Sequence, residues 1–217
     1  MKTGEIKEAL SRGALVKYSS IYSDVAAKTA EIGRLLDLFT ACYGDKEVTV
    51  LSVPGRSEIL GNHTDHNNGV VLAGAIDRDI TAIAAANNDG IIRFFSEGYS
   101  PDEVKISECG DPDNFTKYTS ASLIAGVVDG FCKRGYNVGG FDVYSSSEVL
   151  KGSGISSSAA YEVMIGNVIN HLYNGGVIDN KEIAKLAQYA ENKYFGKPSG
   201  LMDQMACAVG GFVYIDF

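Results

Sequence analysis

A chain of 217 residues with 45% hydrophobic residues can form a packed core, and its charged fraction of 21% is ordinary for a globular protein. The net charge is −8 and Lys and Arg form no cluster, which argues against a nucleic acid or an anionic membrane as the main partner. Cys42, Cys109, Cys132 and Cys207 form no CxxC pair and are most simply reduced thiols of a cytoplasmic protein. The N-terminus lacks the apolar core of a signal peptide, and no run approaches the length of a membrane span.

The hydrophobic pattern places strands in the first half of the chain and helices in the second. In chain order it predicts a helical stretch (4–43), strands (47–53, 69–77, 79–87), a hairpin (90–97 with 102–107), a helix (113–136), a strand (139–147), a loop leading into a helix (150–176), two helices (179–196, 199–211) and a strand (212–217). Asp77-Arg78 is a poor turn, so one bent strand can replace the second and third. This order predicts an α+β fold, with one mixed or antiparallel sheet covered by helices.

The strongest local signal is the Gly/Ser segment from Gly152 to Ala160, at a predicted helix start. Its glycines allow a tight turn, its serines supply hydroxyls, and the first-turn N–H groups of a helix are unpaired. With the helix dipole behind them, these groups favour binding of a phosphate. The spacing fits neither a Walker A loop nor a Rossmann GxGxxG. A Gly/Ser turn with a serine cap is the alternative.

Two carboxylates further along the chain are candidate site residues. Asp203 lies in the first turns of a predicted helix; if an arginine keeps it ionised, it can accept a proton or hold a hydroxyl. Glu191 lies on a helix face, and with a serine hydroxyl it can hold Mg²⁺, which prefers oxygen ligands. Taken alone, each is more simply a capping or solvated acid.

The segment from Pro54 to Val71 is rich in Gly and Asn and carries several polar side chains. A metal site, a site for a polar ligand and a solvated turn all fit it. His63 and His66 are three residues apart, but Asn67-Asn68-Gly69 argues against a helix that would bring them together. A hydroxyl-rich ligand suits the segment better than a metal, because Arg, Asn, His and Asp supply both donors and acceptors.

In this order, the three segments resemble the galactokinase branch of the GHMP small-molecule kinases. The family motif PGR-x-N-L-I-G-E-H-T-D-Y-N-x-G is matched at residues 54–69, G-x-G-L-S-S-S-A at 152–159 and G-x-M-D-Q at 200–204, with the upstream family Glu at Glu191. The resemblance covers about residues 35–217. It implies the family's N-terminal domain, a mixed sheet with helices like ribosomal protein S5, preceded by a helical extension over residues 1–34.

The resemblance also implies ATP-dependent phosphorylation of the anomeric hydroxyl of galactose, with Mg²⁺, giving galactose 1-phosphate and ADP. Asp203 would be the base or orient the hydroxyl, and Arg56 would keep Asp203 ionised and stabilise the transferring charge. The implied sugar contacts are Arg56, Asn62, His63, Asp65, Gly200 and Asp203. The implied phosphate contacts are Gly152, Ser153, Gly154, Ile155, Ser156, Ser157, Ser158 and Ala159. The implied metal ligands are Ser158 and Glu191.

Two departures from the family pattern affect these expectations. Asn62 stands where the family has a Glu that contacts a sugar hydroxyl, so the choice of sugar is open, although a hydroxyl can also donate to the Asn carbonyl. The family's third motif lies in a C-terminal domain that closes the cleft, and the chain ends before it. We therefore expect weak or no turnover from this chain alone, and an exposed apolar face that the second domain covers or that promotes self-association.

Three other functions fit the sequence. A kinase for a different sugar or polyol is motivated by Asn62. A non-catalytic sensor of sugar and ATP can use the same fold, although the intact Arg56, Ser158 and Asp203 argue against it. The third is a structural or partner-binding fragment.

Overall fold

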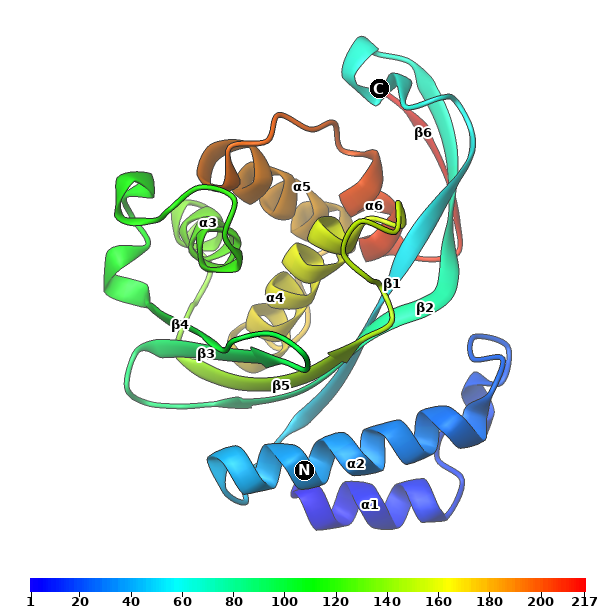
Figure 1. Cartoon of the computed structure of the whole chain (residues 1–217), viewed down its shortest axis with the longest axis vertical. Helices are drawn as coiled ribbons and strands as arrows, with labels where there is room; N and C mark the ends of the chain where they lie inside the picture. The colour runs from blue at the N-terminus through cyan, green and yellow to red at the C-terminus, as the bar shows by residue number, and fades with distance from the viewer.

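The computed structural model describes all 217 residues except the side chains of Asp65 and His66. Within this described part, the strands form one six-stranded sheet in the order β1-β2-β5-β3-β4, and β6 pairs with the first half of β2 (Figure 1). Strands β3 and β5 run parallel and the other pairs are antiparallel. The sheet is therefore mixed, as predicted. The strands are β1 (Thr49–Leu60), β2 (Val70–Ala86), β3 (Ile91–Ser96), β4 (Asp102–Lys105), β5 (Phe141–Ser147) and β6 (Phe212–Asp216).

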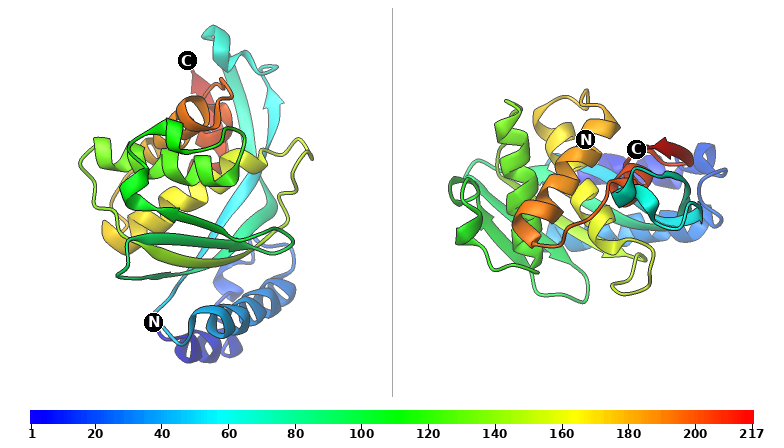
Figure 2. Two further views of the ribbon diagram at one scale, coloured as in Figure 1. Left: turned by 60° about the vertical axis from the view of Figure 1, so that its left-hand side comes forward. Right: turned by 90° about the horizontal axis from the view of Figure 1, so that it is seen from above.

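Helices cover both faces of the sheet and confirm the α+β class. Helices α3 to α6 lie on one face, and α1 and α2 lie on the other (Figures 1 and 2). No helix in the described part is long and apolar enough to cross a membrane. The helices are α1 (Thr3–Ser11), α2 (Val25–Tyr43), α3 (Ser120–Lys133), α4 (Ser157–Tyr173), α5 (Asn180–Ala190) and α6 (Met202–Val209). A π-helical turn (Glu191–Phe195) follows α5.

Strand β2 is the bent strand that the poor turn at Asp77-Arg78 allowed. It runs without a break from Val70 to Ala86. Its second half is buried on both faces: Ile80 packs in the core under α3 to α5, and Ile83 packs in the core under α2. Burial on both faces explains why this half is a nearly continuous apolar run, with little of the alternation of a half-exposed strand.

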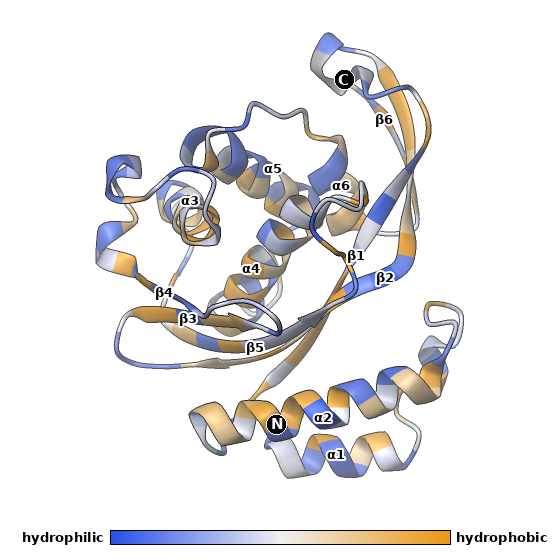
Figure 3. Ribbon diagram, in the orientation of Figure 1, coloured by the Kyte–Doolittle hydropathy of each residue, from blue (hydrophilic) through white to orange (hydrophobic). Residues whose placement is uncertain are grey.

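The N-terminal helices pack on the face of the sheet opposite to the Gly/Ser segment. The predicted helical stretch over residues 4–43 is two helices, and Asp24 caps the second by accepting from Ala27 N at 2.9 Å. The apolar stripe of α2, with Leu35 and Phe39 fully buried, faces the sheet (Figure 3). Helix α2 is continuous across the predicted boundary at residues 34 and 35. The division there stays a prediction.

The boundary of α3 also differs from its predicted range. The helix begins at Ser120, because Thr119 caps it by accepting from Ser122 N at 3.3 Å. The residues that we expected to begin it form a separate 3₁₀ turn (Pro112–Asn114).

Candidate active site

Asp203, in the first turn of α6, is held by side chains from two other segments. Arg56 Nε donates to Oδ1 at 2.8 Å, and Ser156 Oγ donates to Oδ2 at 2.6 Å. Burial by itself raises the pKa of Asp203, but the hydrogen bonds from Arg56 and Ser156 outweigh it, so the pKa lies below its ordinary value. The carboxylate is therefore ionised and oriented at both oxygens, and 27% of the side chain stays exposed.

Arg56, in β1, also ties this carboxylate to the Gly/Ser segment. Its Nη1 donates to Gly154 O at 2.9 Å, and its backbone N donates to Ile155 O at 3.2 Å. The preceding Gly55 lies so close to the segment that an added Cβ would be 2.8 Å from Ile155 O. A glycine before the arginine is thus required by the contact between the two backbones.

The Gly/Ser segment turns through three residues in the left-handed region. Gly152, Gly154 and Ser156 have φ of 80°, 78° and 65°. For Ser156 this conformation costs about 1–2 kcal/mol, and strain of this kind often accompanies a functional site. Its hydroxyl bonds Asp203 and does not cap α4, whereas the Ser153 hydroxyl bonds Leu150 O in its own loop.

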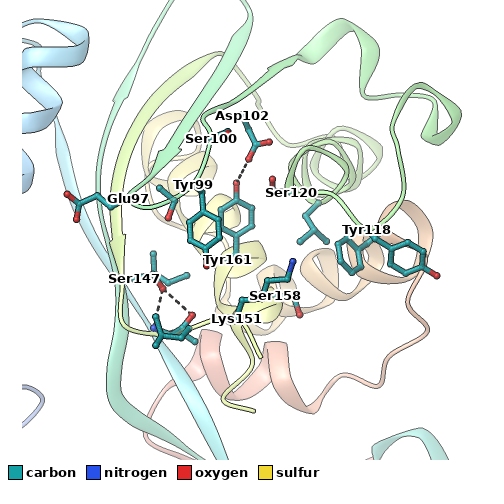
Figure 4. A pocket seen from close by; sticks show the side chains of 17 residues that line it. Glu97, Tyr99, Ser100, Asp102, Tyr118, Ser120, Ser147, Lys151, Ser158 and Tyr161 are labelled. Atoms are coloured by element: carbon teal, nitrogen blue, oxygen red, sulfur yellow. Dashed lines mark hydrogen bonds between the residues drawn. The ribbon is translucent and has the colours of Figure 1, made fainter. Parts of the chain in front are cut away.

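A cavity of about 270 Å³ opens beside the first turn of α4 (Figure 4). Ser157 and Ser158 line it together with Lys151. The aromatic side chains in its lining are Tyr99, Tyr118, Tyr161 and Phe195. Tyr161 donates to Asp102 at 3.4 Å, and burial raises the pKa of Asp102. The Gly/Ser motif contributes Ser157 and Ser158 to this cavity, but the aromatic residues of the lining belong to no motif, so the cavity itself was not predicted.

Glu191, at the start of the π-helical turn, is 1% exposed and is not a solvated surface charge. Its Oε1 accepts from Ser158 Oγ at 2.9 Å and from Lys197 Nζ at 3.0 Å. Its Oε2 accepts from Ser199 Oγ and Gln204 Nε2, both at 2.7 Å. The predicted pair of Ser158 and Glu191 is therefore in direct contact.

The oxygens of Ser158 and Glu191 suit Mg²⁺. They are hard donors, and an ammonium already sits on Glu191 Oε1, which shows that a cation can reach this oxygen. Among the side chains that are described, no group of three His, Cys, Asp or Glu could hold a metal. A site with a single carboxylate is still typical of Mg²⁺, which usually keeps waters and binds substrate phosphates.

A second glutamate lies behind this pair, and no motif in the sequence predicts it. Glu162, in α4, is fully buried and accepts from Gln204 Nε2 at 3.1 Å. The Gln204 amide thus bridges Glu162 and Glu191. Burial, and next the charge of Glu191, raise the pKa of Glu162 well above its ordinary value.

The loop between β1 and β2 contains a 3₁₀ turn (Thr64–Asn67) preceded by Asn62 and His63, both in the left-handed region with φ of 54° and 52°. Glu58 accepts from the His63 backbone N at 2.8 Å, and its carboxylate lies 3.4 Å from His63 Nε2. Glu58, which has no assigned role in the sequence analysis, therefore orders the loop. The predicted role of Asp65, and the metal alternative involving His66, fall on side chains outside the description.

Sequence reasoning also missed Lys197 and Ser199. The signal was present: Lys197-Pro-Ser199-Gly lies just before the predicted helix that carries Asp203. Lys197-Pro198 breaks the helix, which explains the backbone here but assigns no role to the lysine side chain. The predicted Gly200 lies next to these residues and directly precedes the N-cap of α6.

Comparisons with known proteins agree with this geometry. A family model described as "Galactokinase galactose-binding signature" matches residues 37–86, and one described as "GHMP kinases N terminal domain" matches residues 122–211. Curated relatives include galactokinases of Streptomyces coelicolor, 34% identical over 86% of this chain and 49% of the relative, and of Bacillus subtilis, 36% identical over 81% and 45%.

Solved structures give the same result. The galactokinase of Lactococcus lactis complexed with galactose has a TM-score of 0.79 at 28% identity, over 85% of this chain and 49% of that one. The mevalonate kinase of Methanococcus jannaschii has a TM-score of 0.64 at 18% identity, over 78% and 54%, which shows the fold alone. The chain spans about half the length of the curated relatives it matches. It belongs to the GHMP kinases, in their galactokinase branch, and corresponds to the N-terminal domain.

Proposed function

We propose that the chain forms part of a sugar 1-kinase that transfers the γ-phosphoryl group of ATP to the anomeric hydroxyl of galactose. The observation that carries this proposal is the placement of Asp203. Its carboxylate is ionised and is hydrogen-bonded at both oxygens, by Arg56 and Ser156. It therefore lies between β1, which carries Arg56, and the Gly/Ser segment.

In the proposed reaction, the sugar C1 oxygen forms a bond to the γ-phosphorus while the bond from that phosphorus to the β–γ bridging oxygen breaks. Asp203 orients the hydroxyl and takes its proton, and ADP leaves. Arg56 keeps Asp203 ionised through Nε and faces the developing charge of the phosphoryl group. Positioning of this kind supplies much of the catalysis in phosphoryl transfer.

The nucleotide is assigned to the Gly/Ser segment and the adjoining cavity. The N-terminal end of α4 and residues 152–159 face the phosphates, and the aromatic lining suits a nucleotide base. Ser158 and Glu191 hold Mg²⁺ in this proposal. The bound metal neutralises charge on the phosphate oxygens.

The sugar is assigned to the loop that carries Asn62, His63 and Asp65, together with Arg56 and Gly200. Galactose is supported by the matched galactose-binding signature and by the galactose complex of the Lactococcus lactis relative. Asn62 keeps a second candidate open, a different sugar that does not need a carboxylate at this position.

The relatives are about twice as long as this chain, and we propose that a second domain completes the enclosure of the substrates. Leu60, Phe212 and Tyr214 are 71%, 80% and 70% exposed on the ribbon formed by β1, β2 and β6. Such a surface suits coverage by that domain or by a second copy. A cytoplasmic location is also proposed, because the four cysteines are free thiols.

The test is ADP release with Mg·ATP and D-galactose, on this chain and on a version extended to the relatives' length. Galactose-dependent release from the extended protein, lost in Asp203→Asn, would support the proposal. Release with another sugar and none with galactose would overturn the choice of galactose and identify position 62 as a specificity determinant. A folded extended protein that binds sugar and ATP without releasing ADP would be a sensor.

A further inference from the structure

Lys197 donates a hydrogen bond to the same Glu191 oxygen that is a ligand in the proposed metal site. Its Nζ lies 3.0 Å from Glu191 Oε1, the atom that also accepts from Ser158 Oγ at 2.9 Å. The ammonium therefore lies beside the two candidate metal ligands. The backbone supports this placement, since Lys197 N donates to Glu191 O at 3.1 Å, directly after Gly196 in the left-handed region.

All hydrogen-bond acceptor positions of the Glu191 carboxylate are in use. Two oxygens offer about four acceptor positions, and Ser158, Lys197, Ser199 and Gln204 supply four donors. A divalent cation bound to Oε1 must therefore replace a donor. It must also avoid the like charge of an ammonium on the same oxygen.

Lys197 is the donor best able to leave. Its side chain is 53% exposed, whereas that of Glu191 is 2% exposed, so the ammonium covers a buried carboxylate from the solvent side. A lysine reaches its partner through a flexible four-carbon stem and has water to receive it. Gln204, by contrast, is fully buried and also bonds Glu162.

We propose that Lys197 is a resident counter-ion of Glu191 which a divalent cation displaces, so that Lys197 weakens cation binding at Ser158 and Glu191 when no nucleotide is present. This inference rests on the proposed metal site. Once displaced, the ammonium can bond phosphate oxygens of a bound nucleotide. Lys197 therefore weakens binding of the metal alone much more than binding of the metal together with a nucleotide. In this way it couples the two binding events.

The test uses Mn²⁺ as the probe, titrated into the protein without nucleotide while free Mn²⁺ is followed by electron paramagnetic resonance. Removal of one charge-assisted hydrogen bond at a half-exposed lysine is expected to tighten Mn²⁺ binding about tenfold in Lys197→Met. Lys197→Arg, which keeps the charge, stays within about threefold of wild type. Glu191→Gln loses the site, and Mg²⁺ competes for it. With a non-hydrolysable ATP analogue present, wild type and Lys197→Met differ by much less.

Two results would overturn different parts of the argument. If Mn²⁺ binds wild type and Lys197→Met with equal affinity while Glu191→Gln loses Mn²⁺ binding, the proposed role of Lys197 is refuted and the metal site is supported. Unchanged binding in Glu191→Gln would remove the metal site itself. Circular dichroism on each variant establishes that the protein is folded, and a half-exposed side chain is a site where substitution is well tolerated.

Discussion

The proton on Glu162 makes the stability of this domain depend on pH in an unusual direction. Glu162 is fully buried, and burial followed by the charge of Glu191 raises its folded-state pKa well above the ordinary value of 4.5. Above about pH 4.5 the unfolded chain loses this proton while the folded protein keeps it. The stability contributed by Glu162 therefore falls as pH rises from 4.5 toward the folded pKa, by up to about 1.4 kcal/mol for each pH unit.

Glu162→Gln removes this titration and keeps the acceptor for Gln204 Nε2. The new amide N–H₂ replaces Oε1, an atom without a partner here, and it carries one more N–H than the protonated carboxyl. This additional unpaired donor should cost about 1–2 kcal/mol at pH 5. That deficit should shrink with each pH unit and reverse toward pH 8. Urea unfolding at pH 5, 6, 7 and 8 gives the difference from wild type, and Glu103→Gln, at an exposed position on β4, is the matched control. A deficit that stays constant from pH 5 to 8 would refute the reasoning, because Glu162 would then not be protonated in the folded protein.

Three further outcomes follow from the site and the fold. Arg56→Lys should lower galactose-dependent turnover of the extended protein at least a hundredfold, because a lysine cannot bond both the carboxylate in α6 and the loop carbonyl; a loss under threefold would contradict this. Gly55→Ala should lower the free energy of unfolding by about 1–3 kcal/mol, since the added Cβ would meet the Ile155 carbonyl; an unchanged urea midpoint would contradict it. Lys28→Met should cost about 3 kcal/mol by leaving buried Asp79 without its ammonium at 2.7 Å, and should speed hydrogen exchange in α2; unchanged exchange there would mean that the pair does not hold the helix.

Much of the fold could be predicted from the sequence, because the spacing of apolar residues indicates which face of a helix or strand is buried. The α+β class and the mixed sheet were expected from the apolar pattern, whereas the two strands predicted at 69–77 and 79–87 are one strand, the alternative that the poor turn at Asp77-Arg78 had left open. The helix starts were less accurate. Thr119 and Asp24 begin α3 and α2 because their side chains accept first-turn N–H groups, and several polar residues in each loop could equally have done so.

Contacts in the site could be predicted from the sequence where both residues of a contact belong to the family motifs. The expected contacts of Arg56 with Asp203 and of Ser158 with Glu191 are present, while the roles of these residues stay predictions. The bond from Ser156 to Asp203 spans 47 residues of sequence and needs a left-handed Ser156. Nothing in a Gly/Ser segment indicates which serine takes that conformation, so this partner could be found in the structure alone.

The two carboxylates of the site are compensated in different ways, and the difference matches their proposed roles. Asp203 is paired with Arg56, whose side chain is 8% exposed and bonds a backbone carbonyl as well. Glu191 is paired with Lys197, whose side chain is 53% exposed. Among the described contacts, the Lys197 ammonium donates to no acceptor besides Glu191. A proton acceptor needs a charge partner that stays in place through the reaction, so that its pKa does not drift. A metal ligand needs a partner that leaves when the metal arrives, and the more exposed lysine meets that requirement where a buried arginine would not.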